Sequence, residues 1–436
     1  MKISVIGMGC VGLVTAGCFA ESGNDVICVD NDREKIAGFK KNVVPIYERL
    51  LDEIVKRNRA AGRLHFTTEL AEGVGKASVI FIAVETPSAE DGSADISAVL
   101  DVSGKIAELM DGYRVIVTKS TVPMGTYKKV SEMMASRTKY PFDYVSNPEF
   151  IRTGSAVVDF MAPDYVVIGG DNSKAMKIVE QLYRPFVREK NRIIFMDPAS
   201  AELTKYAVNS MLAVRLSFMN EMSALCEKVG ADIELVRTAM SSDVRIGSTF
   251  LSAGIGYGGS CLVKDAQALT HIGDSLGCSM TIVKSVHNAN LCQQNRLTQR
   301  ILDYFADKAK ITLAVWGLAF KPQTSDIREA PAIFCIKKFL EAGIKVRAYD
   351  PQAMYAAKKL LGNRIETSQK SYEILKGADG LVIFTDWQEF RNPDFELIAQ
   401  NLNKAVIFDG RNLYEPSYVK AKGIEYHCIG RPTTKY

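Results

Sequence analysis

The sequence predicts an α/β protein with two Rossmann-like halves and a long helical segment between them. Short apolar runs alternate with helical patterns in the first and in the last third of the chain, which is typical of parallel sheets covered by helices. Between them, residues 199–229 have the pattern of one long helix. We therefore expect three segments, at residues 1–197, 198–307 and 308–436.

The composition narrows the class of protein. The 436 residues give room for about three domains, and 47% hydrophobic with 24% charged residues is ordinary for a globular protein. A net charge of +4 is too small to indicate nucleic-acid binding but suits an anionic metabolite. No apolar run approaches the roughly 18 residues of a membrane span, and we expect no signal peptide before the first strand. The nine cysteines form no Cys-x-x-Cys pair, so we expect a cytoplasmic protein with reduced thiols and no bound metal.

A glycine-rich turn, Gly7-Met8-Gly9-Cys10-Val11-Gly12, follows an apolar run at residues 2–6. A helical pattern continues to Ser22, and a second strand covers residues 25–29. In such a turn the first glycine makes the bend, the second admits a pyrophosphate and the third lets the helix pack on the sheet. The helix N-terminus then faces the phosphates. This context predicts a dinucleotide-binding domain.

The second strand ends in Asp30, close to where a carboxylate contacts the ribose of a dinucleotide. Because a carboxylate repels a 2′-phosphate, Asp30 favours NAD over NADP. Arg33 nearby leaves NADP open.

Polar loops follow several further strands of the first domain. The strands expected are 79–84, 115–118, 142–145, 164–168 and 192–196. Ligands of open α/β sheets bind at the carboxyl ends of the strands. Thr121 could therefore face the cofactor or be a plain turn residue, and Glu149 lies in another such loop.

The long helix has an internal polar stripe. Lys205, Asn209 and Asn220 share one face among Leu, Met, Val and Ala residues. Polar groups on an apolar face need partners. They either bond to neighbouring loops or form a site where domains meet. Further helices are expected from Asp232 and from Lys264 to about residue 305.

A second glycine-rich stretch at residues 256–260 leads into Cys261, followed by Lys264 and Asp265. A cysteine beside a lysine at a helix N-terminus has two causes for a lowered thiol pKa, and a thiolate is a nucleophile. The alternative is a small buried cysteine in a tight turn. The hydride acceptor expected from the first domain favours the nucleophile.

The last third repeats the α/β pattern without a Gly-x-Gly-x-x-Gly turn. Its strands are expected at 311–316, 345–349, 380–384 and 405–409. Lys321 and Arg411, at the ends of two of them, could hold phosphates or be solvated loop charges.

These motifs together resemble the UDP-glucose/GDP-mannose dehydrogenase family, and within it the UDP-glucose 6-dehydrogenases. The resemblance spans nearly the whole chain. It rests on the first glycine turn, Ser120-Thr121-Val122-Pro123, Asn147-Pro148-Glu149-Phe150, Leu203-Thr204-Lys205-Tyr206 with Asn209, Arg245-Ile246-Gly247, Gly258-Gly259-Ser260-Cys261 with Lys264-Asp265, Ala319-Phe320-Lys321-Pro322, residues 326–331 and Asp409-Gly410-Arg411.

The resemblance implies a four-electron, NAD-dependent oxidation of UDP-glucose to UDP-glucuronate. Cys261 would form a thiohemiacetal and then a thioester that water hydrolyses. It also implies a UDP-sugar-binding C-terminal domain, and a homodimer in which Arg245 reaches the neighbouring site. The catalytic residues implied are Cys261, Lys205, Asn209, Asp265, Glu149 and Thr121. The cofactor residues are Gly7, Gly9, Val11, Gly12, Asp30, Arg33, Thr86, Thr121, Lys264 and Arg328. The substrate residues are Glu149, Phe150, Ile151, Lys205, Asn209, Arg245, Phe250, Tyr257, Gly258, Lys321 and Arg411.

The chain departs from the family pattern at a few positions. Thr153 stands where the family usually has Glu, so we expect slower thioester hydrolysis. Glu85 brings a negative charge near the cofactor pocket, and Cys10 replaces the usual Tyr. Two alternatives stay open: the same chemistry on GDP-mannose or a UDP-N-acetylhexosamine, and a sugar-nucleotide-binding protein with little turnover.

Overall fold

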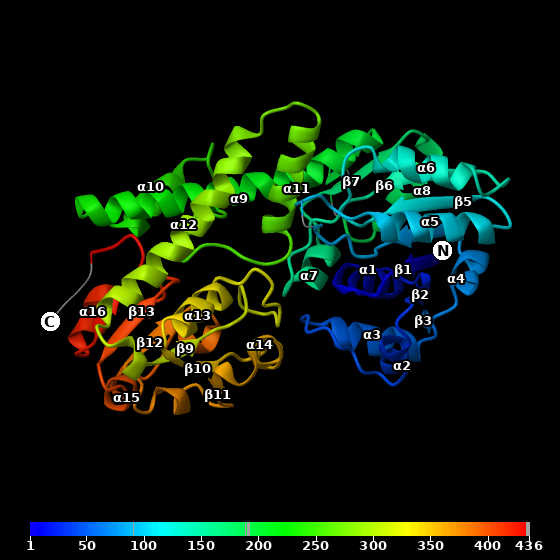
Figure 1. Cartoon of the computed structure of the whole chain (residues 1–436). Coiled ribbons are helices and arrows are strands. Elements are labelled where there is room, and N and C mark those ends of the chain that lie inside the picture. Colours follow the sequence, from blue (N-terminus) through cyan, green and yellow to red (C-terminus); the bar gives the residue numbers. More distant parts are fainter. Residues whose placement is uncertain (90, 188, 190–191, 433–436) are drawn as a thin grey trace. The chain divides into compact units, whose positions relative to one another are not determined.

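The chain forms two compact units, residues 1–208 and 209–436 (Figure 1). The computed structural model describes residues 1–89, 91–187, 189 and 192–432. The boundary between the units falls inside helix α9 (Pro198–Val229), close to the start of the helical segment expected from the sequence. The three-segment division itself stays a prediction. Among the described residues, no helix combines the length and apolarity that crossing a bilayer requires.

The first unit is built on an eight-stranded sheet in the order β3-β2-β1-β4-β5-β6-β7-β8, in which only β6 and β7 pair antiparallel. Its first six strands have the order of a doubly wound dinucleotide fold, which confirms the prediction. The elements are β1 Lys2–Ile6, α1 Cys10–Glu21, β2 Asp25–Val29, α2 Arg33–Lys40, α3 Leu51–Ala60, β3 Leu64–Thr67, α4 Leu70–Lys76, β4 Val79–Ile82, α5 Ser97–Leu109, β5 Arg114–Thr118, α6 Thr126–Ala135, β6 Phe142–Ser146, α7 Ala156–Met161, β7 Val166–Gly170, α8 Ser173–Tyr183 and β8 Ile193–Met196.

Strand β4 shows why this sheet is covered on both faces. Val79 and Phe81 pack into the cluster that contains α1, α3, α7 and α8, while Ile80 and Ile82 pack into the cluster of α4, α5 and α6. All four side chains are buried. Because successive side chains of a strand point to opposite faces of the sheet, both faces must be covered by apolar neighbours. A continuous apolar run therefore marks this central strand.

The second unit combines helices with a six-stranded parallel sheet in the order β11-β10-β9-β12-β13-β14. The sheet repeats the order of the first, which confirms the second Rossmann-like half. Its elements are α10 Ile233–Ser242, α11 Leu262–Ser275, α12 Thr281–Tyr304, β9 Thr312–Trp316, α13 Pro331–Glu341, β10 Lys345–Tyr349, α14 Met354–Leu361, β11 Glu366–Thr367, β12 Gly380–Ile383, α15 Phe395–Asn401, β13 Val406–Asp409, α16 Pro416–Ala421 and β14 Glu425–His427.

Two expected elements differ in detail. The helical stretch from Lys264 divides into α11 and α12, because Gly277 adopts a left-handed φ of +71° and Cys278 donates back to the Gly273 carbonyl at 2.8 Å. Strand β7 begins two residues later than expected and includes Gly169 and Gly170. Glycines carry no apolar signal, so the end of this strand was missed.

In each unit an aspartate follows the second strand of the sheet, but the two aspartates have different hydrogen-bond partners. Asp30, after β2, accepts from the Met8 amide, the Asp32 amide and the Lys35 ammonium. Asp350, after β10, is fully buried and accepts five donors, at 2.7 to 3.1 Å: the amides of Leu318, Ala319, Gln352 and Ala353, and the Trp387 indole. A carboxylate offers about four lone-pair sites, so Asp350 has none left for a ribose hydroxyl.

We expect Asp350→Ala to destabilise the second unit by about 3 kcal/mol or more, because it leaves several buried donors without acceptors. Urea unfolding followed by tryptophan fluorescence measures this, since Trp316 and Trp387 both lie in this unit. The exposed Asp307→Ala is the control and should stay within about 0.5 kcal/mol of the parent. A loss for Asp350→Ala no greater than for Asp307→Ala would contradict the assignment.

Candidate active site

The first glycine turn has the geometry expected of a phosphate cradle. Gly7 has a φ of +95°, and a Cβ on Gly12 would lie 1.8 Å from the Gly7 carbonyl oxygen. Only glycine therefore fits at Gly12, where α1 meets the turn. A Cβ on Gly9 would meet nothing closer than the Glu85 carboxylate at 4.0 Å. The space above Gly9 fits a pyrophosphate, with Val11 in the first turn of α1.

The charges around this cradle are of both signs. Asp30 is 8% exposed, and its two oxygens accept three donors, so a ribose hydroxyl can still bond to it. Arg33 begins α2 and is exposed. Glu85, flagged by the sequence, is exposed and lies beside Gly9, the glycine that would face the pyrophosphate.

Lys205 is brought onto the loop after β6. Its Nζ donates to the Glu149 carbonyl at 2.7 Å and to Glu149 Oε1 at 3.1 Å, and both residues are buried. The other carboxylate oxygen accepts from the Ile151 amide at 2.8 Å. The Phe150 ring lies 5.4 Å from the ammonium. These hydrogen bonds compensate the loss of hydration of the buried Lys205–Glu149 ion pair, without which the pair would destabilise the fold.

The loops after β4 and β5 are joined near Thr121. Thr86 Oγ1 donates to the Thr121 carbonyl at 2.8 Å. Further along, the Glu202 carboxylate of α9 accepts from the Gly125 and Tyr127 amides, both at 2.7 Å. Burial raises the pKa of Glu202 to about 7. Sequence reasoning missed Glu202, although a lone acid one turn before Lys205 was visible on the helix.

In the second unit, Cys261 directly precedes α11 and Asp265 lies in its first turn. Cys261 is the N-cap residue and is exposed, and its carbonyl accepts from the Asp265 amide at 2.9 Å. Asn209 Nδ2 donates to Asp265 Oδ2 at 2.6 Å, so three predicted residues gather here. Asn220, the third residue of the polar stripe, instead accepts from the Gly254 amide. Of the two alternatives given for the stripe, Asn220 therefore fits the one in which it bonds to a neighbouring loop.

Cys261 is exposed, whereas most of the other cysteines are buried or half-buried. No disulfide forms among the described residues, which include all nine cysteines. Burial raises the pKa of Cys18 and of Cys335 to about 12, so those thiols stay protonated. Cys278 and Cys292 are exposed as well, but neither lies in a glycine-rich turn. In the described part of the chain, no group of His, Cys, Asp or Glu residues could hold a metal ion.

The glycine-rich loop before Cys261 is tightly confined. A Cβ on Gly258 would lie 2.1 Å from the Glu329 carbonyl oxygen, and the Gly259 amide donates to the Arg328 carbonyl at 2.9 Å. On the other side, the Asn290 side chain bonds to both the amide and the carbonyl of Tyr257. Tyr257 is buried against α11 and α12.

Three amide side chains of α12 that hold this loop were missed from the sequence. They are Asn290, Gln293 and Gln294, all buried, and the last two donate to the carbonyls of Gly254 and Tyr257. Their spacing puts them on one helix face. A polar stripe of amides on an otherwise apolar face was the available signal.

Arg411 binds backbone rather than solvent. Its guanidinium donates to the carbonyls of Phe384, Gly256 and Phe320 at 2.7, 3.3 and 3.1 Å. The alternative of a solvated loop charge is therefore excluded for Arg411. Lys321 lies 5.8 Å from the Phe320 ring. A role for either side chain in substrate binding stays a prediction.

The remaining predicted residues lie at exposed or half-buried positions. The Arg245 side chain is 85% exposed and pairs with Asp243, whose hydrogen bonds raise the pKa of Arg245. Arg328 is exposed and pairs with Asp326. Two further ones are half-buried: Phe250, with a φ of +58°, and Lys264.

Comparison with protein families gives three consecutive matches. The NAD binding domain of the UDP-glucose/GDP-mannose dehydrogenase family matches residues 1–187, its central domain 199–291 and its UDP binding domain 314–416.

Relatives of known name cover the whole chain. A UDP-glucose 6-dehydrogenase of Pseudomonas aeruginosa is 44% identical, over 99% of this chain and 98% of its own. One of Bacillus subtilis is 42% identical, over 100% and 94%. Among solved structures, a UDP-glucose dehydrogenase of Pyrobaculum islandicum is 34% identical with a TM-score of 0.90, over 98% and 96% of the two chains. A UDP-D-ManNAc dehydrogenase of Pyrococcus horikoshii is 27% identical with a TM-score of 0.87, over 99% of each.

We expect Glu85→Gln to tighten NAD binding about threefold at low ionic strength, because it removes a negative charge beside the pyrophosphate glycine. The gain should shrink as salt is raised. Calorimetric titration of NAD at two salt concentrations measures it, with the exposed Glu132→Gln as the matched control. Equal affinity of the Glu85 variant and its parent at low salt would show that this carboxylate does not reach the cofactor.

Proposed function

Since the chain belongs to the UDP-glucose/GDP-mannose dehydrogenase family, we propose that it oxidises UDP-glucose to UDP-glucuronate with NAD. One observation carries the proposal. Cys261 and Asp265 lie at the N-terminus of α11, and Asn209 of α9 donates a hydrogen bond to Asp265. The relatives that are 44% and 42% identical, both named UDP-glucose 6-dehydrogenase, support this substrate.

The cofactor residues of this chain fit NAD. The glycine cradle leaves room at Gly9, and Asp30 keeps acceptor capacity for a ribose hydroxyl. Bound NAD supplies the hydride acceptor, once for each of two oxidation steps. The chain binds the cofactor through α1 and orients it with the loops of Thr86 and Thr121.

Cys261 is the nucleophile in this proposal. The first oxidation turns the C6 alcohol of the sugar into an aldehyde. The thiolate adds to the aldehyde carbon and gives a thiohemiacetal, and the second oxidation gives a thioester. Water cleaves the C–S bond, which releases the carboxylate and returns the thiol. Covalent capture keeps a reactive aldehyde from leaving.

The neighbouring polar residues have separate roles. Lys205 donates to the oxyanion that develops at C6, and the Glu149 contacts hold its ammonium in place. Asn209 orients Asp265, which with Thr121 holds the hydrolytic water. Thr153, half-buried in the loop after Glu149, offers a hydroxyl but no base, so hydrolysis is the slow step.

A panel of sugar nucleotides tests the function directly. Purified protein is given NAD with UDP-glucose, GDP-mannose or a UDP-N-acetylhexosamine, and NADH is counted per sugar consumed. Two NADH per UDP-glucose support the proposal. One NADH per sugar would indicate a simple alcohol dehydrogenase, and no turnover with any sugar nucleotide would indicate a binding protein.

We expect Cys261→Ala to abolish formation of the acid while NAD binding stays intact, because the aldehyde then has no thiolate to capture it. Acid formation followed by chromatography and NAD affinity measured by calorimetry check both parts. The exposed Cys278→Ser is the matched control and should keep full turnover. Two NADH per sugar from the alanine variant would remove Cys261 from the mechanism.

We infer that the protein acts as a homodimer built on α9. Met211, Phe218 and Leu225 are 59%, 45% and 55% exposed and repeat every seven residues, so they form one apolar stripe. Exposed apolar surface of this kind is typical of interfaces. The exposed Arg245 is then available to the neighbouring chain, as the family resemblance implies.

We expect Phe218→Glu to convert the dimer into a monomer, because it places a charge in the apolar stripe. Light scattering coupled to size exclusion measures the mass. Leu397→Glu, at a residue 38% exposed on α15, is the control and should leave the mass unchanged. A monomeric parent protein, or a variant with the parent's mass, would contradict the interface.

A further inference from the structure

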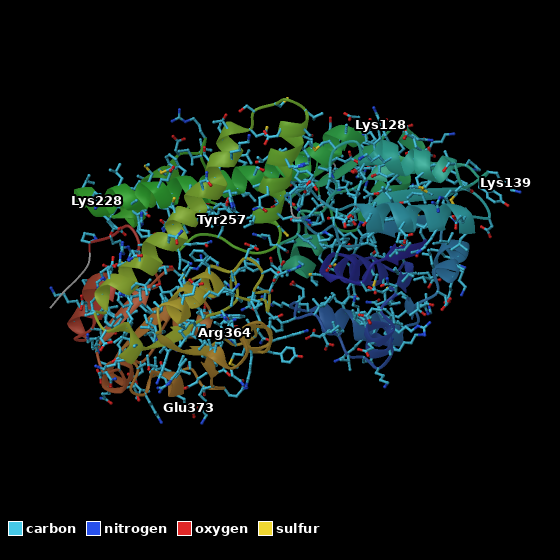
Figure 2. The ribbon with its side chains drawn as sticks, in the orientation of Figure 1. Lys128, Lys139, Lys228, Tyr257, Arg364 and Glu373 are labelled. Carbon is cyan, nitrogen blue, oxygen red and sulfur yellow. The ribbon has the colours of Figure 1, made fainter. Side chains whose placement is uncertain are left out.

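The first unit holds a lysine that the proposed reaction does not use. Lys119 directly follows β5 and is only 3% exposed. Lysines are almost never buried without a reason, because the ammonium loses its hydration. By contrast, Lys128 and Lys139 of the same unit are exposed and extend from the surface in Figure 2.

The surroundings of Lys119 are built to hold a cation. Its Nζ lies 3.3 Å from Asn147 Oδ1 and 3.4 Å from the Asn147 carbonyl oxygen. The rings of Tyr183 and Phe160 lie 5.6 and 6.0 Å from the same ammonium. Aromatic faces and carbonyl oxygens are what a buried cation binds when it has no carboxylate in contact.

Asn147 links Lys119 to the loop that contains Glu149. Its amide donates to the Thr118 carbonyl, its Nδ2 donates to the Val167 carbonyl at 2.7 Å, and its Oδ1 accepts from the Tyr183 hydroxyl at 2.6 Å. Asn147 is fully buried and fixed from every side. Two residues further on is Glu149, whose carboxylate and carbonyl receive Lys205.

Three buried charges are thus coupled. Glu149, from the loop after β6, attracts Lys119, and Lys205, from α9, repels it. Tyr183, from α8, faces Lys119 with its ring, and Cys18 of α1 is near enough to Tyr183 to act on its pKa. Burial lowers the pKa of Lys119 from its ordinary 10.5 to about 8. The ammonium is therefore charged at neutral pH and loses its proton in mildly alkaline solution.

We propose that Lys119 is a positioning residue for the reaction. Its ammonium holds residues 147–150 in place through Asn147 and so fixes the Glu149 carboxylate against Lys205. This inference rests on the proposed function. Glu149 of this loop supplies both the carbonyl and the carboxylate oxygen that accept from the Lys205 ammonium, so a displaced loop displaces the oxyanion donor. A shift of about 1 Å in such a group costs up to about a hundredfold in rate.

The kinetic test uses Lys119→Met, which keeps the stem and removes the charge. We expect kcat with UDP-glucose and NAD to fall about ten- to a hundredfold, with KM for both within about twofold. The parent's kcat should decline through an alkaline limb near pH 8, and the variant should lack that limb. An unchanged kcat, or a reduced kcat with the parent's pH profile, would overturn the proposal.

Two further variants separate charge from packing. Lys119→Gln keeps a donor to Asn147 without the charge and should behave like Lys119→Met, which also covers a methionine variant that fails to fold. Tyr183→Phe removes one bond to Asn147 but leaves the charge, so it should keep the alkaline limb. The exposed Lys139→Met, whose ammonium lies 5.4 Å from the Tyr140 ring, should match the parent in every measurement.

A stability measurement tests Lys119 independently of catalysis. Because the folded protein holds this proton less tightly than the unfolded chain, stability should rise between about pH 8 and 10.5 as the buried charge is lost. The Tm of the parent, compared with Lys119→Met, should therefore shift upward between pH 8 and 10. A Tm difference that is constant from pH 7 to 10 would show that Lys119 is not a buried ammonium and would overturn the proposal, even if no sugar nucleotide were turned over.

Discussion

A buried ammonium must find oxygen acceptors, and the first unit is arranged around one that does. Lys205 reaches both the carbonyl and the carboxylate of Glu149, so a charge on α9 is satisfied by the loop after β6. Since either partner alone would be an uncompensated buried charge, the loop and the helix must be placed together. The Thr121 loop meets the same helix through Glu202. The loops after β5 and β6 are thereby both held by contacts to one helix.

In the second unit, backbone contacts and amide side chains hold the loop before Cys261. The glycines before Cys261 let the backbone approach the loop at residues 328–330, and amide side chains bind the polar groups of the glycine-rich loop itself. Close backbone contact excludes any side chain at Gly258. Near Cys261, the Asn209 side chain donates to Asp265 and so orients a carboxylate that is 1% exposed.

The two Rossmann-like sheets show how one topology yields two kinds of domain. Both place an acid after the second strand of the fold. In the first unit Asp30 keeps acceptor capacity at the edge of an open glycine cradle, whereas in the second Asp350 is filled by five donors. The same residue type therefore keeps room for a further donor in one half and holds loops together in the other. A pattern search by residue type alone would treat both acids alike.

The sequence by itself determined the sheets, the long helix and the glycine cradle, because each depends on the spacing of residues close together in the chain. Short continuous apolar runs, helical stripes and glycines at fixed intervals can be recognised without knowing any distant partner. Only the tertiary structure decided which buried polar groups meet. Lys119, Glu202 and the amides of α12 bind loops far away in the chain, and hydrogen bonds between such distant residues leave no local pattern. The backbone partners of Asn220 and Arg411 were likewise visible only in the fold.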